Sequence, residues 1–145
     1  AAVAKYKETI LAAVATRQAA YDANFDAYFK AVDALLASQK SNSGGDVTAF
    51  KSAITAAVDK AKASCAAGVS GDTVKKQLKA DLKAARDSFK SQRSTDKSSI
   101  KAQLKALKET RKSANTKARD AFKVTLEAAR TELKAAFPST ESETL

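Results

Sequence analysis

The chain has 145 residues, of which 44% are apolar, with four glycines, one proline and no histidine, methionine or tryptophan. This length fits one domain, and the alanine-rich composition favours helix at nearly every position. The formal net charge is +10, and no apolar run approaches the roughly 18 residues that a membrane-spanning helix needs, so we expect a basic, all-α chain that is not transmembrane.

The first predicted helix covers residues 2–39. Apolar residues recur there at two heptad positions, which predicts a coiled-coil-like seam formed by Leu11, Gln18, Phe25 and Val32 together with Val14, Tyr21, Tyr28 and Leu35. Four aromatic residues fall within residues 21–29, and core packing or an assembly contact would both explain them. Phe29 is expected to be the most exposed of the four, and it is the apolar assembly candidate.

Two glycine-containing segments are predicted to break the chain. The sequence Ser-Asn-Ser-Gly-Gly at 41–45 predicts a turn before a second helix over residues 47–67. Cys65 lies on the apolar side of that helix and is expected to be a buried small side chain. A second turn at 68–71 is expected to lead into a third helix, with Asp72 or Thr73 as its cap.

Residues 72–137 repeat with a period of 11. Lysine or arginine occupies two positions of every repeat, and apolar residues keep the same period, which predicts a long C-terminal helix with hendecad repeats. Whether this helix is continuous through the polar residues 92–96 stays open. The expected fold is therefore an all-α, elongated bundle of three or four helices, with residues 1–137 as a single domain and 138–145 as an acidic flexible tail.

The two basic columns are the candidate binding or assembly stripe. As the edge of a helical core, they would be solvated side chains that cover apolar surface with their stems. As a track, they would bind a polyanion such as nucleic acid, an acidic polymer or anionic lipid heads. The stripe consists of Lys75, Lys79, Arg86, Lys90, Lys97, Lys101, Lys108, Lys112, Arg119, Lys123, Arg130 and Lys134.

A resemblance and the N-terminus bear on location. The phrase Ala-Arg-Asp-Ala-Phe-Lys at 118–123 and the composition of residues 72–137 resemble the alanine- and lysine-rich exported helical proteins of small-genome bacteria, a likeness that implies no particular activity. The chain starts with Ala-Ala-Val and not with methionine, as after signal-peptide removal, although a chain trimmed for another reason would start the same way. We expect an exported protein that is extracellular, on the cell surface or periplasmic.

The sequence offers no catalytic constellation. Histidine is absent, cysteine occurs once, and neither a glycine-rich phosphate loop nor metal-ligand spacing is present. Asp22, Asp26 and Asp33 share one helix face and are expected to be solvated. We therefore expect no enzyme activity, cofactor, metal or small-molecule substrate. The expected function is that of a structural protein that self-assembles into a surface filament or layer; the alternative is a polyanion-binding module, and a periplasmic chaperone is less favoured.

Overall fold

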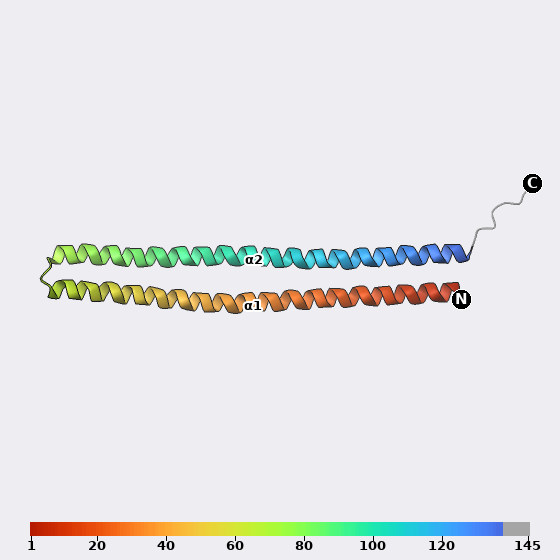
Figure 1. The fold of residues 1–145 in the computed structure, drawn as a ribbon, viewed down its shortest axis with the longest axis horizontal. Helices are drawn as coiled ribbons and strands as arrows, with labels where there is room; N and C mark the ends of the chain where they lie inside the picture. Colours follow the sequence, from red (N-terminus) through yellow and green to blue (C-terminus); the bar gives the residue numbers. More distant parts are fainter. Residues whose placement is uncertain (138–145) are drawn as a thin grey trace, which may run out of the picture. The chain divides into compact units, whose positions relative to one another are not determined.

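The computed structural model describes residues 1–137, and these form two helices, α1 (Ala2–Ala66) and α2 (Gly71–Ala136), joined by one turn (Figure 1). No strand is present among the described residues, so the prediction of an all-α fold is confirmed. The tail expected at 138–145 lies outside the described residues.

The prediction of three or four helices is wrong, because α1 runs without interruption through the expected turn at 41–45. Gly44 and Gly45 are both helical and exposed. Each glycine costs a helix about 1 kcal/mol relative to alanine. A break would also require a second helix nucleation and would disturb the contacts of the flanking turns, including the stacking of Phe50 on Phe89 at 5.0 Å between ring centroids. The gain from a continuous helix exceeds the cost of two glycines.

Helix α2 is likewise continuous through residues 92–96, which answers the question that the sequence left open. The polar residues there do not end the helix, since Gln92 donates a hydrogen bond from Nε2 to Oδ1 of Asp96 one turn later, at 3.2 Å. Asp96 is only 9% exposed and is the one buried charged residue of the described chain. Asp96 thus belongs to the contact between the helices, whereas residues 92–95 are exposed.

The turn expected near residues 68–71 is confirmed, and its hydrogen bonds explain why α1 ends there. Gly68 has a φ of 77°, in the left-handed region that favours glycine. The amide of Val69 donates to the carbonyl of Ser64 at 3.1 Å and the amide of Gly68 to that of Cys65 at 3.0 Å, the pattern of a Schellman motif. Ser70, not Asp72 or Thr73, immediately precedes α2, and its hydroxyl lies 2.8 Å from that of Thr73.

Contacts divide the chain into two compact units, each of which contains a segment of α1 and a segment of α2. The hairpin unit holds residues 32–105 and therefore the turn. The terminal unit holds residues 1–31 and the described residues from 106 onward. In both units the segments pack antiparallel, as Phe50 against Phe89 and Asn24 against Asn115 illustrate.

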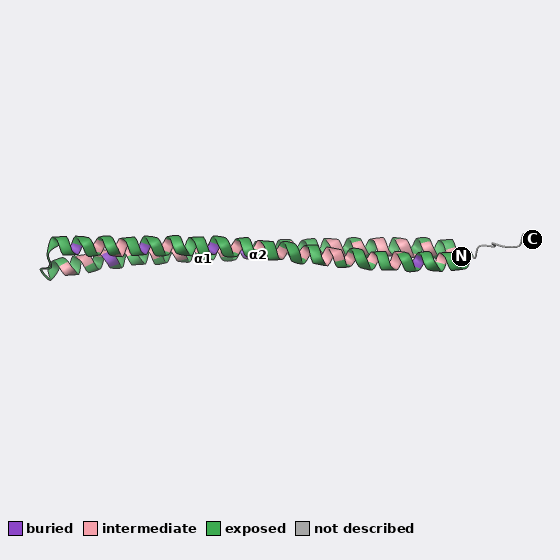
Figure 2. Cartoon of the chain, turned by 90° about the horizontal axis from the view of Figure 1, so that it is seen from above, coloured by how far each residue is buried: buried purple, intermediate pink, exposed green. Residues whose placement is uncertain are grey.

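The core of each unit is thin, and most of each helix surface is exposed (Figure 2). The buried apolar residues are Leu35, Ala57, Val74 and Ala85 in the hairpin unit and Ala129 in the terminal unit. No large side chain of the described residues is fully buried. The coiled-coil-like seam is only half right: the heptad position of Val14, Tyr21, Tyr28 and Leu35 is buried or half-buried, whereas Leu11, Gln18 and Phe25 of the other position are exposed. A heptad drifts about 20° per repeat around a straight helix.

Candidate functional site

All twelve residues of the basic stripe are exposed. Six of them, from Lys75 to Lys101, belong to the hairpin unit, and six, from Lys108 to Lys134, belong to the terminal unit. Among the described residues, Arg119 alone of the twelve has a carboxylate within ion-pair distance, with 3.4 Å from its Nε to Oδ1 of Asp120. The remaining side chains are therefore available to an anionic partner or to a neighbouring chain.

A second surface lies on α1 in the terminal unit, and we call it the apolar face: Leu11, Phe25 and Phe29. These side chains are 60%, 52% and 45% exposed. Leu11 and Phe29 are 18 residues apart, which is five turns, and Phe25 is displaced from them by about 40° around the helix. The rings of Phe25 and Phe29 contact each other with 4.6 Å between centroids. Phe29 was predicted to be exposed, but the prediction that Phe25 belongs to the seam is wrong.

Acidic residues accompany the apolar face. Asp22 and Asp26 are exposed on the same side of α1, one turn before Phe25 and one residue after it. Asp33, which follows in the hairpin unit, is exposed too. The side of α1 that carries the apolar face is thus apolar and mainly acidic, with Lys7 as an exposed basic residue one turn before Leu11, whereas α2 carries the basic stripe.

The helix contact of the terminal unit contains polar residues that the sequence did not single out. Asn24 donates from Nδ2 to Oδ1 of Asn115 at 3.0 Å. The guanidinium of Arg17 lies 4.2 Å from the ring centroid of Phe122, and that of Arg111 lies 4.6 Å from the ring centroid of Tyr28. The half-buried amide pair and the two cation–π contacts stabilise one register of the two helices, because a shift of one helix along the other would break all three contacts.

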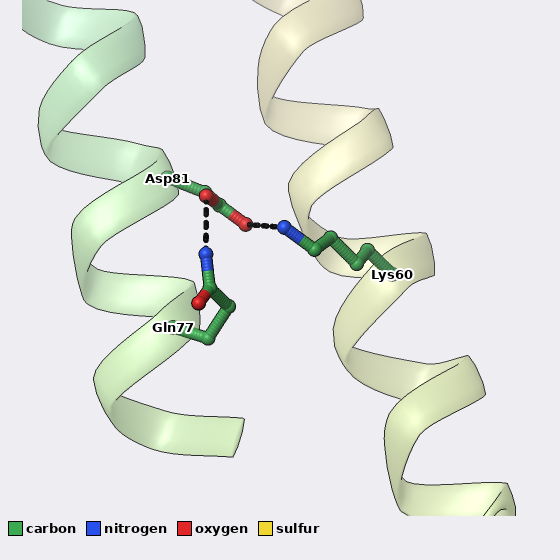
Figure 3. Close-up of polar contacts among 3 residues, drawn as sticks. All are labelled: Lys60, Gln77 and Asp81. Atoms are coloured by element: carbon green, nitrogen blue, oxygen red, sulfur yellow. Dashed lines mark hydrogen bonds and ion pairs between the residues drawn. The ribbon is translucent and has the colours of Figure 1, made fainter. Parts of the chain in front are cut away.

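The hairpin unit has a comparable polar contact near the turn. Lys60 donates from Nζ to Oδ2 of Asp81 at 3.0 Å, and Gln77 donates to the other carboxylate oxygen at 2.8 Å (Figure 3). The hydrogen bonds from Lys60 and Gln77 favour the charged carboxylate and lower the pKa of Asp81 from its ordinary value. This contact fixes the pairing of α1 and α2 beside the turn.

Asp46 on α1 and Asp96 on α2 form the least expected contact. Their carboxyl groups are within hydrogen-bonding reach of each other. One oxygen of each, Oδ2, is buried and has no hydrogen-bond partner. Burial raises the pKa of Asp46 from its ordinary value, the hydrogen bond and charge of Asp96 raise it further, and Arg93 partly opposes this. A sequence pattern reveals such a pair only when the helix register is known.

The remaining features of the described residues are their acidic and cysteine side chains and the grooves between the helices. No group of three or more histidine, cysteine, aspartate or glutamate residues gathers in residues 1–137 as metal ligands would. Cys65 is exposed, so the expectation of a buried side chain is wrong; it lies in the last turn of α1, where the end of the helix contact leaves one side open. A groove of about 680 Å³ lies in the terminal unit, and its lining includes alanines 12, 13, 20, 118 and 121.

Neither α1 nor α2 contains a segment apolar enough, over a sufficient length, to cross a membrane. Comparisons of the chain with protein-family models, with curated proteins and with solved structures find no match.

Proposed function

We propose that this chain is a non-catalytic, exported structural protein that self-associates through its helix surfaces. The observation that carries the proposal is the apolar face of α1, where Leu11, Phe25 and Phe29 are 45–60% exposed. A second copy of the chain is the partner, because the chain itself carries a basic surface that complements the acidic residues of this face.

The energetic argument starts from the thin core. Two helices cover each other on one side only, so two or more helices from another copy are needed to bury the rest. Phe25 and Phe29 each expose roughly 100 Å² of a side chain of about 200 Å². At about 25 cal/mol per Å², burial of both adds roughly 5 kcal/mol before the cost of association is subtracted. That is a substantial part of a micromolar contact, for which about 8 kcal/mol is needed.

Charge determines which surfaces of two copies meet. Asp22 and Asp26 flank the aromatic pair, and the basic stripe of α2 offers lysine and arginine side chains without ion-pair partners in the described chain, apart from Arg119. An α1-to-α2 contact between copies joins two different surfaces, and where such a contact does not close into a dimer or a ring it repeats from copy to copy and builds a filament or layer. The alanine-lined groove of the terminal unit lets helices approach closely.

We attribute the order of these surfaces to the eleven-residue repeat. Support comes from half-buried residues spaced by 11 in the terminal unit: Tyr6, Arg17 and Tyr28 on α1, and Arg111, Phe122 and Leu133 on α2. Eleven residues make three turns, so each contact recurs on the same line after about 16 Å. The same spacing sets the basic residues at a regular interval that a neighbouring copy can match.

The test is sedimentation of the full chain over a series of protein and salt concentrations. Wild type is expected to form particles larger than a monomer, and salt is expected to weaken them because exposed charges are screened beyond about 8 Å at physiological ionic strength. The double variant Phe25→Ser, Phe29→Ser is expected to stay monomeric. Val124→Ser is the matched control, since Val124 is 67% exposed on α2 and lies outside the apolar face. A wild-type chain that is monomeric at high concentration in low salt overturns the proposal.

One observation favours a second candidate function, the binding of a polyanion. The basic stripe occurs in both units and all of its residues are exposed. If it binds nucleic acid, the logarithm of the affinity for a DNA duplex should fall linearly with the logarithm of salt concentration. Replacing Lys108, Lys112 and Lys123 by glutamine should then reduce the slope by about one for each of these lysines that neutralises a phosphate. Fluorescence anisotropy with a labelled duplex and with heparin measures this, and equal weak binding by wild type and variant excludes it.

A further inference from the structure

The contact between Asp46 and Asp96 in the hairpin unit brings two acceptor groups together where a donor is expected. Asp96 is only 9% exposed, and its Oδ1 accepts a hydrogen bond from Gln92 at 3.2 Å. Its Oδ2 and the Oδ2 of Asp46 are both buried and lack partners. Two ionised carboxylates in this arrangement repel each other, and each loses the water that would solvate its charge.

A single proton satisfies both groups. When one carboxyl is protonated, its hydroxyl donates to an oxygen of the other, so the arrangement gains a charge-assisted hydrogen bond and loses one of two negative charges. We propose that Asp46 and Asp96 share one proton across the contact of α1 with α2, and that the hairpin unit is thereby strengthened by mild acid. This inference is independent of the proposed function, because it concerns the pairing of two helices within one chain.

The charged side chains around the pair do not replace the shared proton as a hydrogen-bond donor. Asp46 feels the charges of two groups on α2, Asp96 and Arg93. Arg93 attracts the carboxylate, but its side chain is exposed and its guanidinium lies 5.8 Å from the ring centroid of Phe89. On α1 the nearest charged residues in the sequence are Lys40 and Lys51, which are both exposed. Within residues 1–137, no cation donates a hydrogen bond to either of the two partnerless oxygens.

The direction of the pH effect follows from the raised pKa of Asp46. Between the ordinary carboxyl value of 3.8 and the raised value, the folded chain holds a proton that the unfolded chain has released. Stability contributed by that proton is therefore present at the acidic end of this window and is lost as the pH rises through the raised pKa. Asp81 and Asp87, whose pKa values are lowered, lose their contributions only at pH values below 3.8.

The experiment compares thermal unfolding of the full-length wild type, Asp96→Asn and Asp46→Asn at pH 7.5 and pH 4.5. An asparagine amide donates to the remaining carboxylate as the shared proton does. At pH 7.5 each variant should therefore unfold at a temperature several degrees above wild type, and the difference should shrink at pH 4.5. Asp87→Asn is the matched control: Asp87 is exposed on α2 and is paired with Lys83 at 2.6 Å, so its removal should leave the response between these pH values unchanged.

Hydrogen exchange of the wild type gives a readout that needs no variant. After correction for intrinsic rates, amides in residues 42–50 and 92–100 should be more protected at pH 4.5 than at pH 7.5. The inference is overturned if both asparagine variants are no more stable than wild type at pH 7.5, or if protection there does not change with pH. It is also overturned if millimolar Ca²⁺ or Mg²⁺ at pH 7.5 stabilises wild type but not Asp96→Asn, since the pair would then be a cation site.

Discussion

Replacing Gly44 and Gly45 by alanine tests the continuity of α1 directly. Both glycines are helical and exposed, and an added Cβ at either position would meet no atom within 4 Å. Alanine is about 1 kcal/mol more favourable than glycine in a helix interior. The double variant should therefore raise the free energy of unfolding by roughly 1.5–2 kcal/mol, which corresponds to an increase of about 3–8 °C in melting temperature for a chain of this size.

Urea unfolding followed by far-ultraviolet circular dichroism measures this gain, with the slope of free energy against urea unchanged if only stability is affected. Gly68→Ala is the matched control, because Gly68 also has open space around it but has a φ of 77°. Alanine in that left-handed conformation should cost about 1 kcal/mol or more. If the double variant is as destabilised as the Gly68 variant, residues 41–45 form a turn and the account of α1 is refuted.

Three further predictions concern the helix contacts. Asp81→Asn should lower the melting temperature at pH 7, and its difference from wild type should shrink as the pH falls below 3.8, because the contribution of Asp81 is present above 3.8 and is lost as the pH falls through its lowered pKa; thermal scans over this range check it. Asn115→Ala should cost about 1 kcal/mol in urea unfolding by leaving the half-buried amide of Asn24 without its partner, whereas equal stability would mean that water replaces the bond. One residue inserted after Thr110 should lower stability far more than Lys112→Gln, because the insertion rotates the α2 residues on one side of it by about 100° away from α1. Similar melting temperatures for the two variants would show that the packing of α2 does not depend on which of its residues face α1.

The fold class and the position of the turn were accessible from the sequence because they depend on local chemistry. The scarcity of helix-breaking residues predicts helix, and a glycine that can adopt positive φ ends α1 at the place where it is needed. The prediction of a turn at Gly44 and Gly45 was wrong because it also relied on local chemistry. These two residues disfavour helix, but the stability of a helix is a sum over many residues, and the favourable residues of the flanking turns of α1 outweigh the two glycines.

The candidate surfaces were accessible only in part. A repeated lysine or arginine on a helix is expected to be solvated, and the exposure of the basic stripe could be anticipated from charge alone. The exposure of Leu11 and Phe25 could not be anticipated. A heptad position drifts around a straight helix, so residues that share a heptad position do not all lie on the side that faces the partner helix. The pairing of Asp46 with Asp96 depends on the register of two helices far apart in sequence. No local pattern specifies that register.

The single turn at Gly68 also determines the order in which the contacts can form. Lys60 and Asp81 are separated by 21 residues, whereas Asn24 and Asn115 are separated by 91. Closing the longer loop from the unfolded chain costs about 1.3 kcal/mol more, so pairing begins beside the turn and proceeds toward the termini. During synthesis, residues 1–31 cannot pack against α2 until the residues from 106 onward have been made. Over that interval the N-terminal segment exposes both its apolar face and the side that later packs against α2, which makes it the part of the nascent chain with the greatest need of protection from premature association.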